Sequence, residues 1–365
     1  MAGRYADIHD ELRSVAGDLL TKDRPARSEV AWPLLAQTGW IGLEAPESLG
    51  GAGATFEEVA IVLSEMGRAA ARTSYLGGAV LGVGTLMSLQ PGESRDALLQ
   101  GVVSGAVRAA VALSGDHESA VVDVPFRVER TGGALHVHGR SSFVPDAADA
   151  GRLLLLADES GGTPVVVGVA ARAPRLSVTA QPVLDETRRL AAVAADGVPV
   201  EDSSMWRFDG DPRQRLRGLL DRACVAVACD SLGLGDAMLA ATVSYAGLRR
   251  QFGRPIGSFQ AVKHACADMA VQVSVARRLV RAAAAAVADG RPDATRAAAM
   301  AKSYACTAAV EVVGKAMQLH GGIGYTWESG IHVYLKRAAL NRSLLGSPAA
   351  HRAQLALGYL ARVDT

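Results

Sequence analysis

The sequence predicts a mainly α-helical protein with a β domain in its middle. Apolar residues at helical spacing, broken by glycine-rich turns, fill the first hundred residues. Valine-rich segments separated by turn residues follow from about Ala106, and alanine-rich helical runs extend from about Arg213 to the end. A chain of 365 residues, 49% of them hydrophobic, is long enough to bury a sizeable core. The order of these patterns predicts three parts, 1–105, 106–210 and 211–365.

The N-terminal part contains one clear helix start and one clear turn. Thr55 and Glu58 form a capping box in front of the apolar run 59–66. The preceding segment, Pro46–Gly53, contains three glycines and a proline. Such a segment cannot continue a helix, so it is expected to form a turn.

The middle part is expected to form antiparallel strands joined by tight turns. Its segments are rich in valine and leucine, which suit a pleated and half-buried surface. Double glycines at 132–133 and 161–162 supply two of the turns. The expected strands are Val121–Val128, Ala134–His138, Leu153–Ala157 and Val165–Val169.

The C-terminal part is expected to be a helical bundle. Three long alanine-rich helices are predicted over Leu216–Arg249, Ala261–Asp289 and Ala294–Leu319. Gly290 ends the second helix, and Pro292–Asp293 supplies a start for the third. Alanine-rich helices pack closely and leave surfaces that another subunit can cover at little cost, so a tetramer-forming bundle is a natural expectation.

Composition argues against several classes of protein. Lysine plus arginine number 38 and aspartate plus glutamate 37, without a basic block, which argues against a nucleic-acid binder. The four cysteines lack paired spacing, so neither a disulfide framework nor a zinc site is expected. His136 and His138 share a strand face without a third ligand, so no metal site is expected either. No signal-like N-terminus and no charge-free apolar stretch of about twenty residues is evident, and a cytoplasmic protein without a membrane segment is expected.

Two segments some seventy residues apart carry the strongest functional signal. They are Arg249–Gln260, which reads RRQFGRPIGSFQ, and Gln318–Tyr325, which reads QLHGGIGY. Each places a cationic or amide side chain beside backbone that glycine makes permissive. An extended diphosphate ligand needs this combination, because arginine forks onto phosphate oxygens and glycine lets backbone N–H groups approach. The two segments together predict a binding site for FAD.

These segments resemble the signature motifs of the acyl-CoA dehydrogenase family, and the resemblance covers nearly the whole chain. Pro46–Gly53 is similar to a turn between the family's N-terminal helices, and Asp185–Arg188 is similar to a motif near the end of its β domain. The resemblance implies the acyl-CoA dehydrogenase fold. That fold has an N-terminal helical domain, a β-barrel-like middle domain and a C-terminal four-helix bundle, and it is usually assembled as a tetramer.

In that family FAD lies across a subunit interface, and the neighbour's two C-terminal motifs hold its diphosphate and adenosine. By residue-to-residue match, the cofactor-binding residues expected in this chain are Arg249, Gln251, Phe252, Gln318, Gly321, Gly322 and Gly324. The first three are expected to contact the diphosphate arm, and the other four are expected to approach it through backbone. His320 is expected to lie beside the arm as a spacer, not as a catalyst.

The β part departs from the family pattern where the flavin ring would be held. Family members that hold their own flavin usually carry Thr-Glu-Pro-Gly-x-Gly-Ser-Asp, but this chain has Ala112–Ser119, in which Gly115 removes the glutamate. Farther along, Pro145 stands where a threonine would hydrogen-bond the flavin, and proline has neither an N–H nor a hydroxyl. Phe143 either packs on a ring face or belongs to the core.

The catalytic base is missing from both positions where the family places it. The reaction needs a carboxylate to take the α-proton of an acyl thioester while the β-hydrogen leaves as hydride to the flavin. The commonest position corresponds to Leu345 and the other to Ala223. Asp221 falls on the wrong face of that helix, which leaves Asp230, on the same face as Ala223, as the candidate base. A structural ion pair with an arginine of a neighbouring helix is the competing interpretation of Asp230.

The resemblance and the losses together favour a subunit of an α2β2 acyl-CoA dehydrogenase that supports FAD bound mainly by a catalytic partner subunit. By analogy with paired subunits of actinobacteria, the expected substrate is a bulky sterol-derived acyl-CoA, and the expected electron acceptor is an electron-transfer flavoprotein. Two alternatives stay open, namely a self-sufficient homotetrameric dehydrogenase with Asp230 as base and a non-catalytic ligand-binding or scaffold protein on the same fold. Oxidation by O2 also stays open.

Overall fold

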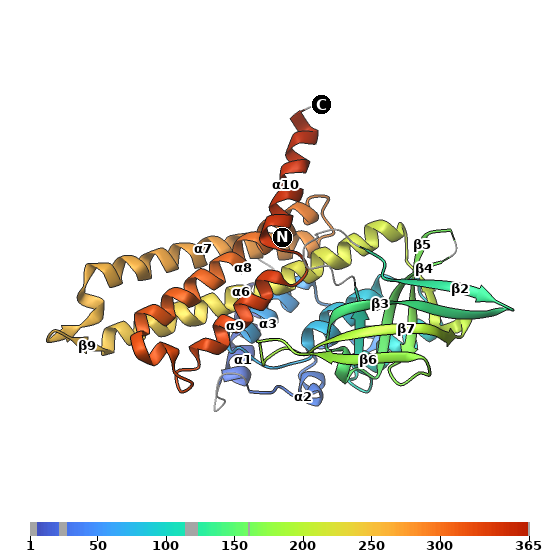
Figure 1. Cartoon of the computed structure of the whole chain (residues 1–365), viewed down its shortest axis with the longest axis horizontal. Helices are drawn as coiled ribbons and strands as arrows, with labels where there is room; N and C mark the ends of the chain where they lie inside the picture. Colours follow the sequence, from blue (N-terminus) through green and yellow to red (C-terminus); the bar gives the residue numbers. More distant parts are fainter. Residues whose placement is uncertain (1–5, 22–27, 114–122, 160, 364–365) are drawn as a thin grey trace. The chain divides into compact units, whose positions relative to one another are not determined.

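The computed structural model of the chain describes residues 6–21, 28–113, 123–159 and 161–363 (Figure 1). These residues form two compact units that interleave along the sequence. The helical unit draws on Met1–Glu29, Ala60–Arg72 and Cys224–Thr365, and the sheet unit on Val30–Val59 and Thr73–Ala223. Each of the two units takes residues from more than one of the three parts predicted from the sequence. The division at residues 105 and 210 stays a prediction.

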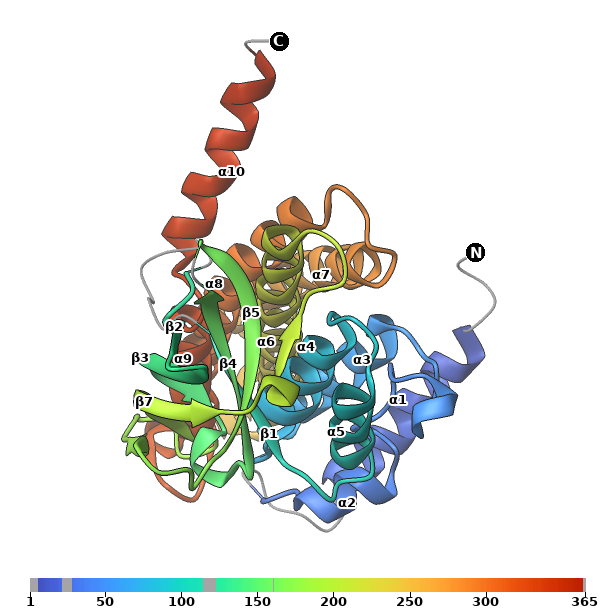
Figure 2. The ribbon, with the colours of Figure 1, turned by 90° about the vertical axis from the view of Figure 1, so that its right-hand side faces the viewer.

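The helical unit is built mainly from helices (Figure 1). They are α1 (Ala6–Thr21), most of α3 (Phe56–Arg68), α6 (Pro212–Leu248) from Cys224 on, α7 (Gln260–Ala288), α8 (Ala294–His320), α9 (Ile331–Ser343) and α10 (Pro348–Val363). α8 packs against α7, α9 and α10, and the alanines on its buried face permit this close approach. α6, α7 and α8 confirm the three long helices predicted from the sequence. α10 extends away from the other helices of its unit in both Figure 1 and Figure 2.

α6 is a core helix of great length and apolarity. Among the described helices it is the one long and apolar enough to cross a membrane, but 78% of its most apolar window is buried, as in the core helix of a soluble protein. Within the helical unit its backbone touches that of α3. A Cβ on Gly233 would lie 2.0 Å from the carbonyl oxygen of Ser64, and one on Gly67 would lie 2.0 Å from that of Asp230. Only glycine fits at these two crossing points.

The sheet unit is organised around an eight-stranded sheet (Figure 2). Its strands are β1 (Ala109–Ala112), β2 (Phe126–Thr131), β3 (Ala134–Pro145), β4 (Arg152–Glu159), β5 (Thr163–Ala170), β6 (Leu176–Gln181), β7 (Leu190–Val200) and β8 (Met205–Arg207). Their order is β6-β7-β3-β2-β4-β5-β8, with β1 paired to β4. Val137 of β3 and Leu153 and Leu155 of β4 are fully buried in the core of this unit. Leu153 and Leu155 are two positions apart, and residues two apart in a strand point to the same face of the sheet.

Two strand pairings correct the expectation of purely antiparallel strands. β1 pairs with β4 in parallel, and so does β2. β2 and β3 form the predicted hairpin, but β4 lies on the other side of β2 from β3 and runs in the direction of β2. The predicted strand Val121–Val128 begins at Phe126, and its residues up to 122 lie outside the described part of the chain. The sequence did not indicate β7, because this strand is rich in alanine, which has low strand propensity.

Short helices complete the sheet unit. They are α2 (Trp32–Gln37), η1 (Glu47–Leu49), η2 (Leu76–Val83, a π-helix), α4 (Gly84–Met87), α5 (Glu93–Val103), η3 (Ala147–Asp149) and η4 (Asp202–Ser204). The predicted turn Pro46–Gly53 is confirmed, and a Cβ on its Gly51 would lie 2.0 Å from the carbonyl oxygen of Ala45. The predicted capping box is also confirmed, because Glu58 Oε2 accepts 2.7 Å hydrogen bonds from the N–H and the hydroxyl of Thr55.

Candidate cofactor-binding site

The first of the two C-terminal motifs forms a small hairpin after α6. Its strands are β9 (Arg250–Gln251) and β10 (Arg254–Pro255), which pair antiparallel. The turn requires positive φ at Phe252 (52°) and at Gly253 (79°), and for phenylalanine this is an uncommon conformation. Phe252 is 90% exposed, and Arg249 and Gln251 are exposed beside it. The three residues matched to the diphosphate arm therefore all face solvent on one short hairpin.

The second motif follows the end of α8 and continues as a short 3-10 helix, η6 (Gly321–Tyr325). Gly321 has φ of +62°, which favours glycine, and a Cβ on Gly324 would lie 2.4 Å from the Met317 carbonyl oxygen. Gly322 has neither constraint, because its φ is not positive and an added Cβ would meet nothing within 4 Å. Two of the three matched glycines are thus needed by the chain itself. Gly322 instead leaves exposed backbone that an outside group can approach.

The two motifs meet through an aromatic stack. The ring of Tyr245, near the end of α6, stacks on His320 with centroids 4.4 Å apart, and its hydroxyl lies 3.4 Å from the His320 carbonyl oxygen. His320 Nδ1 lies 2.8 Å from the carbonyl oxygen of Ala316. His320 therefore has a structural role at the junction, and its expected place beside the cofactor arm stays a prediction.

The polar side chains of the two motifs are available to an outside ligand. Within the described part of the chain, Arg249 has no carboxylate within 4.0 Å and the amide of Gln251 has no hydrogen-bond partner. Gln318 is exposed, and its amide oxygen accepts from Lys315 at 3.4 Å, which leaves its NH2 group to donate. An arginine fork, two amides and open glycine backbone suit a diphosphate. These residues therefore fit the diphosphate arm of FAD.

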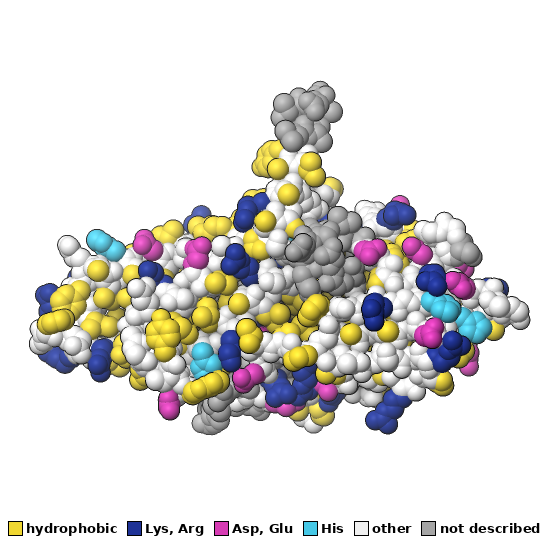
Figure 3. Space-filling view, in the orientation of Figure 1, with side chains coloured by type: hydrophobic (Ala, Val, Ile, Leu, Met, Phe, Trp, Pro, Cys, Tyr) yellow, Lys and Arg dark blue, Asp and Glu magenta, His cyan; other side chains and the backbone are white. Residues whose placement is uncertain are grey.

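Large apolar side chains surround this set of polar groups. Leu248 is 79% exposed, Tyr325 70%, Trp327 64% and Ile323 49%. Figure 3 shows hydrophobic side chains among basic ones at the end of the helical unit that carries β9. Apolar side chains gathered at one place on a surface mark an interaction site. The sequence interpretation included Tyr325 as the last residue of the second motif without giving it a role, and it missed Trp327, although two aromatics so close to a glycine motif were a signal for them.

Asp230 is buried, 1% exposed, and held by an arginine of a neighbouring helix. Arg337 donates from Nη2 to Oδ1 at 2.5 Å and from Nε to Oδ2 at 2.9 Å, and Asn341 donates to Oδ2 at 2.6 Å. The third guanidinium nitrogen of Arg337 donates to the carbonyl oxygen of Ala71 at 2.7 Å. These contacts favour the structural ion pair over the catalytic base. The role of Asp230 as a base stays a prediction. Its two carboxylate oxygens already accept three hydrogen bonds from Arg337 and Asn341.

The two positions where the family carries its base are both apolar and buried. Ala223, in the sheet unit, is fully buried, and Leu345, in the helical unit, is 9% exposed. Leu345 lies in a turn and has φ of +61°. Its carbonyl oxygen accepts a hydrogen bond from His351 Nε2 at 3.0 Å. The buried ammonium of Lys302 holds the same turn through the carbonyl oxygen of Gly346 at 3.0 Å. The turn is well fixed, but leucine has no atom that takes a proton.

The strand expected to face the flavin ring is irregular in the sheet unit. The register of β3 against β7 shifts between Ser141 and Val144, and Phe143 between them has φ of +55°. The N–H of Phe143 donates to Gln181 Oε1 at 2.5 Å. Pro145 ends β3 and offers no donor. Most of the segment Ala112–Ser119 lies outside the described residues, so its fit to a flavin is not described.

Two carboxylates organise the loops near the end of β3. Asp185 Oδ1 accepts from the N–H and the hydroxyl of Thr187 at 2.9 and 2.6 Å, so the motif Asp185–Arg188 contains a tight local turn. Asp146 is buried and accepts the N–H of Gly77, at the start of η2, at 2.8 Å. Burial raises the pKa of Asp146 to about 6, although the hydrogen bond from Gly77 opposes the shift.

Two family models match the sequence. Residues 8–106 match the N-terminal domain of acyl-CoA dehydrogenase, and residues 214–360 match the C-terminal domain of acyl-CoA dehydrogenase. Among curated proteins, the acyl-CoA dehydrogenase IpdE2 of Mycolicibacterium smegmatis is 34% identical over 318 residues, which cover 87% of this chain and 84% of that protein. IpdE2 of Mycobacterium tuberculosis is 33% identical over 88% of this chain and 83% of its own length.

Solved structures agree with these matches. A variant of the Tcur3481-Tcur3483 steroid ACAD has a TM-score of 0.83 and 28% identity, covering 98% of this chain and 99% of that one. The ChsE4-ChsE5 complex from Mycobacterium tuberculosis has a TM-score of 0.82 and 26% identity, covering 96% and 97%. The butyryl-CoA dehydrogenase of Megasphaera elsdenii, at 22% identity and a TM-score of 0.87 over 99% of this chain and all of that one, shares the fold.

Proposed function

The chain belongs to the acyl-CoA dehydrogenase family of flavin-dependent oxidoreductases, and from this premise we propose that it is one subunit of a two-chain enzyme that desaturates an acyl-CoA. It supports FAD at the interface with a catalytic partner subunit. The observation that carries the proposal is an asymmetry between two sets of residues. The arginine and the two glutamines matched to a neighbour's FAD are exposed, and among the described residues Arg249 has no carboxylate within 4.0 Å, whereas both base positions are apolar and Asp230 is held in an ion pair.

The chain's own part in the reaction is to hold and orient the cofactor. Arg249 binds a phosphate oxygen pair, Gln251 and Gln318 donate amide hydrogens, and the backbone at Gly322 comes close to the arm. FAD, when bound, supplies the hydride acceptor. The exposed rings of Phe252 and Trp327 supply apolar surface that helps to exclude water from the arm.

Removal of the α-proton is assigned to the partner subunit. Neither Leu345 nor Ala223 has a group that accepts a proton. Asp230 is occupied by Arg337 and Asn341, and freeing it would leave a buried guanidinium without its partner. A carboxylate contributed by another chain avoids that cost.

The proposed substrate is a bulky acyl-CoA derived from a sterol, and the proposed assembly is α2β2. Similarity to a steroid ACAD and to a two-protein complex supports both parts of this proposal. An electron-transfer flavoprotein is the proposed electron acceptor, and the cytoplasm the proposed compartment.

Native mass spectrometry combined with a visible absorbance spectrum tests the proposal. The chain is expressed alone and together with candidate partner subunits of the same family. Two flavins per four chains, present only after co-expression, are the expected result. Four flavins on a tetramer of this chain alone would favour the self-sufficient homotetramer, and failure to acquire flavin with any candidate partner would favour the scaffold protein.

A further inference from the structure

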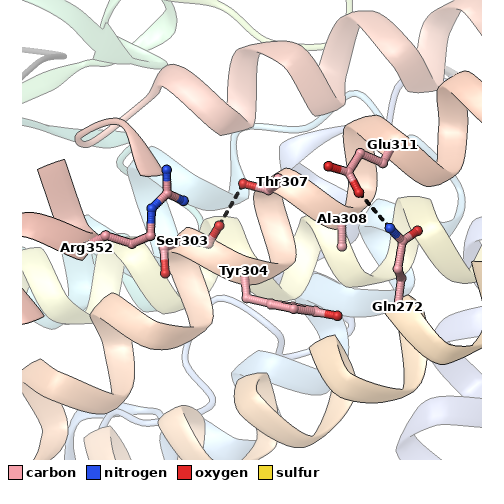
Figure 4. Close-up of a pocket in the computed structure, with 7 residues that line it drawn as sticks. All are labelled: Gln272, Ser303, Tyr304, Thr307, Ala308, Glu311 and Arg352. Atoms are coloured by element: carbon pink, nitrogen blue, oxygen red, sulfur yellow. Dashed lines mark hydrogen bonds between the residues drawn. The ribbon is translucent and has the colours of Figure 1, made fainter. Parts of the chain in front are cut away.

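A groove lined by several polar side chains lies on the helical unit, away from the residues matched to FAD. It consists of two adjoining hollows of about 230 and 410 Å³ that share Thr307 and Arg352. The first runs along α7 and α8, and Figure 4 shows Arg352 of α10 at one end of it and the pair Gln272 and Glu311 at the other. The second continues to the end of α9 and the start of α10, where Arg342 and Ser347 line it. The groove shares no residue with the two C-terminal motifs.

Two guanidinium groups in this groove lack an acidic partner. Within the described residues, neither Arg342 nor Arg352 has a carboxylate within 4.0 Å, whereas exposed Arg277 on α7 pairs with Asp236. The one carboxylate that lines the groove is Glu311, which accepts from Gln272 Nε2 at 2.6 Å. Figure 3 shows basic side chains on the surface beside the start of α10. The charge at this end of the groove is therefore positive and uncompensated.

A third, buried cation adds to this charge. Lys302 is fully buried, and its ammonium donates to the carbonyl oxygens of Asn341 at 3.0 Å, Arg342 at 3.3 Å and Gly346 at 3.0 Å. Carbonyl dipoles satisfy its hydrogen bonds but do not neutralise its charge. No carboxylate of the described chain lies within 4.0 Å of it. A buried charge is screened less by solvent than an exposed one, so Lys302 raises the potential at the turn that precedes α10.

The remaining polar groups of the groove include two hydroxyls that can donate. Ser347 Oγ accepts the N–H of Ala350 at 3.2 Å, so its own hydrogen is free, and the hydroxyl of Tyr304 has no partner among the described residues. The hydroxyls of Ser303 and Thr307 donate to carbonyl oxygens of their own helix, so these two residues line the groove without offering a hydrogen to a ligand. The groove therefore offers donors and positive charge at one end, which suits an anion.

We propose that this groove binds a phosphate dianion, either free or carried by a nucleotide as a phosphomonoester. A dianion offsets two of the three unpaired cations, and guanidinium forks match tetrahedral oxyanions. The larger hollow is of the size that holds a small ligand. The bound anion joins Arg342 of α9 to Arg352 of α10, and so links α10 to the rest of its unit. This proposal does not depend on the proposed function.

Calorimetric titration of the purified full-length chain tests the proposal with two ligands. Orthophosphate represents the free anion, and adenosine 3′,5′-bisphosphate represents the nucleotide-borne one, with sodium chloride at equal ionic strength as the blank. We expect saturable binding of at least one ligand. The double variant Arg342→Gln with Arg352→Gln is expected to weaken it about tenfold or more, because each guanidinium makes charge-assisted hydrogen bonds. Arg281→Gln, an exposed arginine of α7 outside the groove, is the matched control and is expected to bind like the unmodified chain.

A conservative variant separates charge from geometry. Arg352→Lys keeps the charge but loses the planar fork, and its affinity is expected between those of the unmodified chain and of Arg352→Gln. Circular dichroism checks that each variant is folded, as expected for changes at exposed positions. Binding of the bisphosphate alone identifies a nucleotide source and supports the proposal. Heat no greater than that of the chloride blank overturns it, and so does undiminished binding in the double variant.

Discussion

Arginine serves opposite purposes in two regions of the helical unit. Arg337 is 1% exposed and donates hydrogen bonds to Asp230 and to a backbone carbonyl oxygen, so its charge is neutralised within the chain. Arg249 is exposed on the β9–β10 hairpin and has no carboxylate within 4.0 Å among the described residues. The first arrangement fixes the packing of α6 against α9. The second leaves a charge that no carboxylate of the described residues neutralises.

The comparison separates residues that hold the fold from residues that bind. A buried charge without a partner is destabilising by several kcal/mol, so buried ionic groups must find partners within the chain. An exposed charge is solvated and needs none, so its lack of a partner is informative only beside a second feature, such as open glycine backbone with apolar side chains or a hollow in the surface. Four experiments test this separation.

The largest effect is expected when the buried pair is broken. Arg337→Met leaves the Asp230 carboxylate buried without its cation, and the free energy of unfolding in urea is expected to fall by about 3 to 5 kcal/mol. Adding Asp230→Leu removes the orphaned charge and is expected to restore most of that loss. A loss below about 1 kcal/mol for the single variant would show that Asp230 is not the ion-pair residue inferred from the contacts.

Asp146 extends the comparison to a buried carboxyl that has no salt bridge with any described residue. Its folded pKa, about 6, lies above its ordinary value of 3.8, so the stability it contributes is fully present below 3.8 and is lost as pH rises through about 6. At 1.36 kcal/mol per pKa unit, the unmodified chain is expected to lose about 3 kcal/mol between acid and neutral pH relative to Asp146→Asn. Unfolding of both proteins across this range measures the difference, and parallel curves would contradict it.

Arg249→Gln tests the exposed side of the comparison. The dissociation constant of FAD from the co-expressed complex is expected to rise about tenfold or more, because a charge-assisted phosphate contact is lost. The free energy of unfolding of the chain alone is expected to stay within about 0.5 kcal/mol, because the side chain makes no internal ion pair. Fluorescence of released flavin measures the first quantity and urea unfolding the second. Arg281→Gln serves as control, and equal flavin retention in the two variants would argue against the arm.

Two glycines of one motif give the smallest and sharpest contrast. Gly324→Ala drives a Cβ into the Met317 carbonyl oxygen and is expected to cost about 1 to 3 kcal/mol of stability. Gly322→Ala meets no atom within 4 Å, so stability is expected to be unchanged while flavin retention weakens. If Gly322→Ala retains flavin fully, the cofactor does not approach the backbone there.

Local sequence patterns predicted much of the fold. The capping box at Thr55, the turn at Pro46–Gly53 and the three long C-terminal helices were predictable because each depends on residues within a few positions of one another. The two C-terminal motifs were recognisable for the same reason. The prediction was weaker for the sheet, where β7 is rich in alanine and β4 takes a place that no local signal sets.

The sequence by itself therefore determined many of the local elements and the family, and it predicted a set of residues for binding FAD. Tertiary structure decided which charges are paired. Arg337 meets Asp230 across 107 residues, and Tyr245 meets His320 across 75, because α6 packs beside α8 and α9. A carboxylate looks the same in a sequence whether it is a base or half of an ion pair. Only the approach of a distant guanidinium distinguishes the two, and that approach depends on the packing of whole helices, which no short pattern encodes.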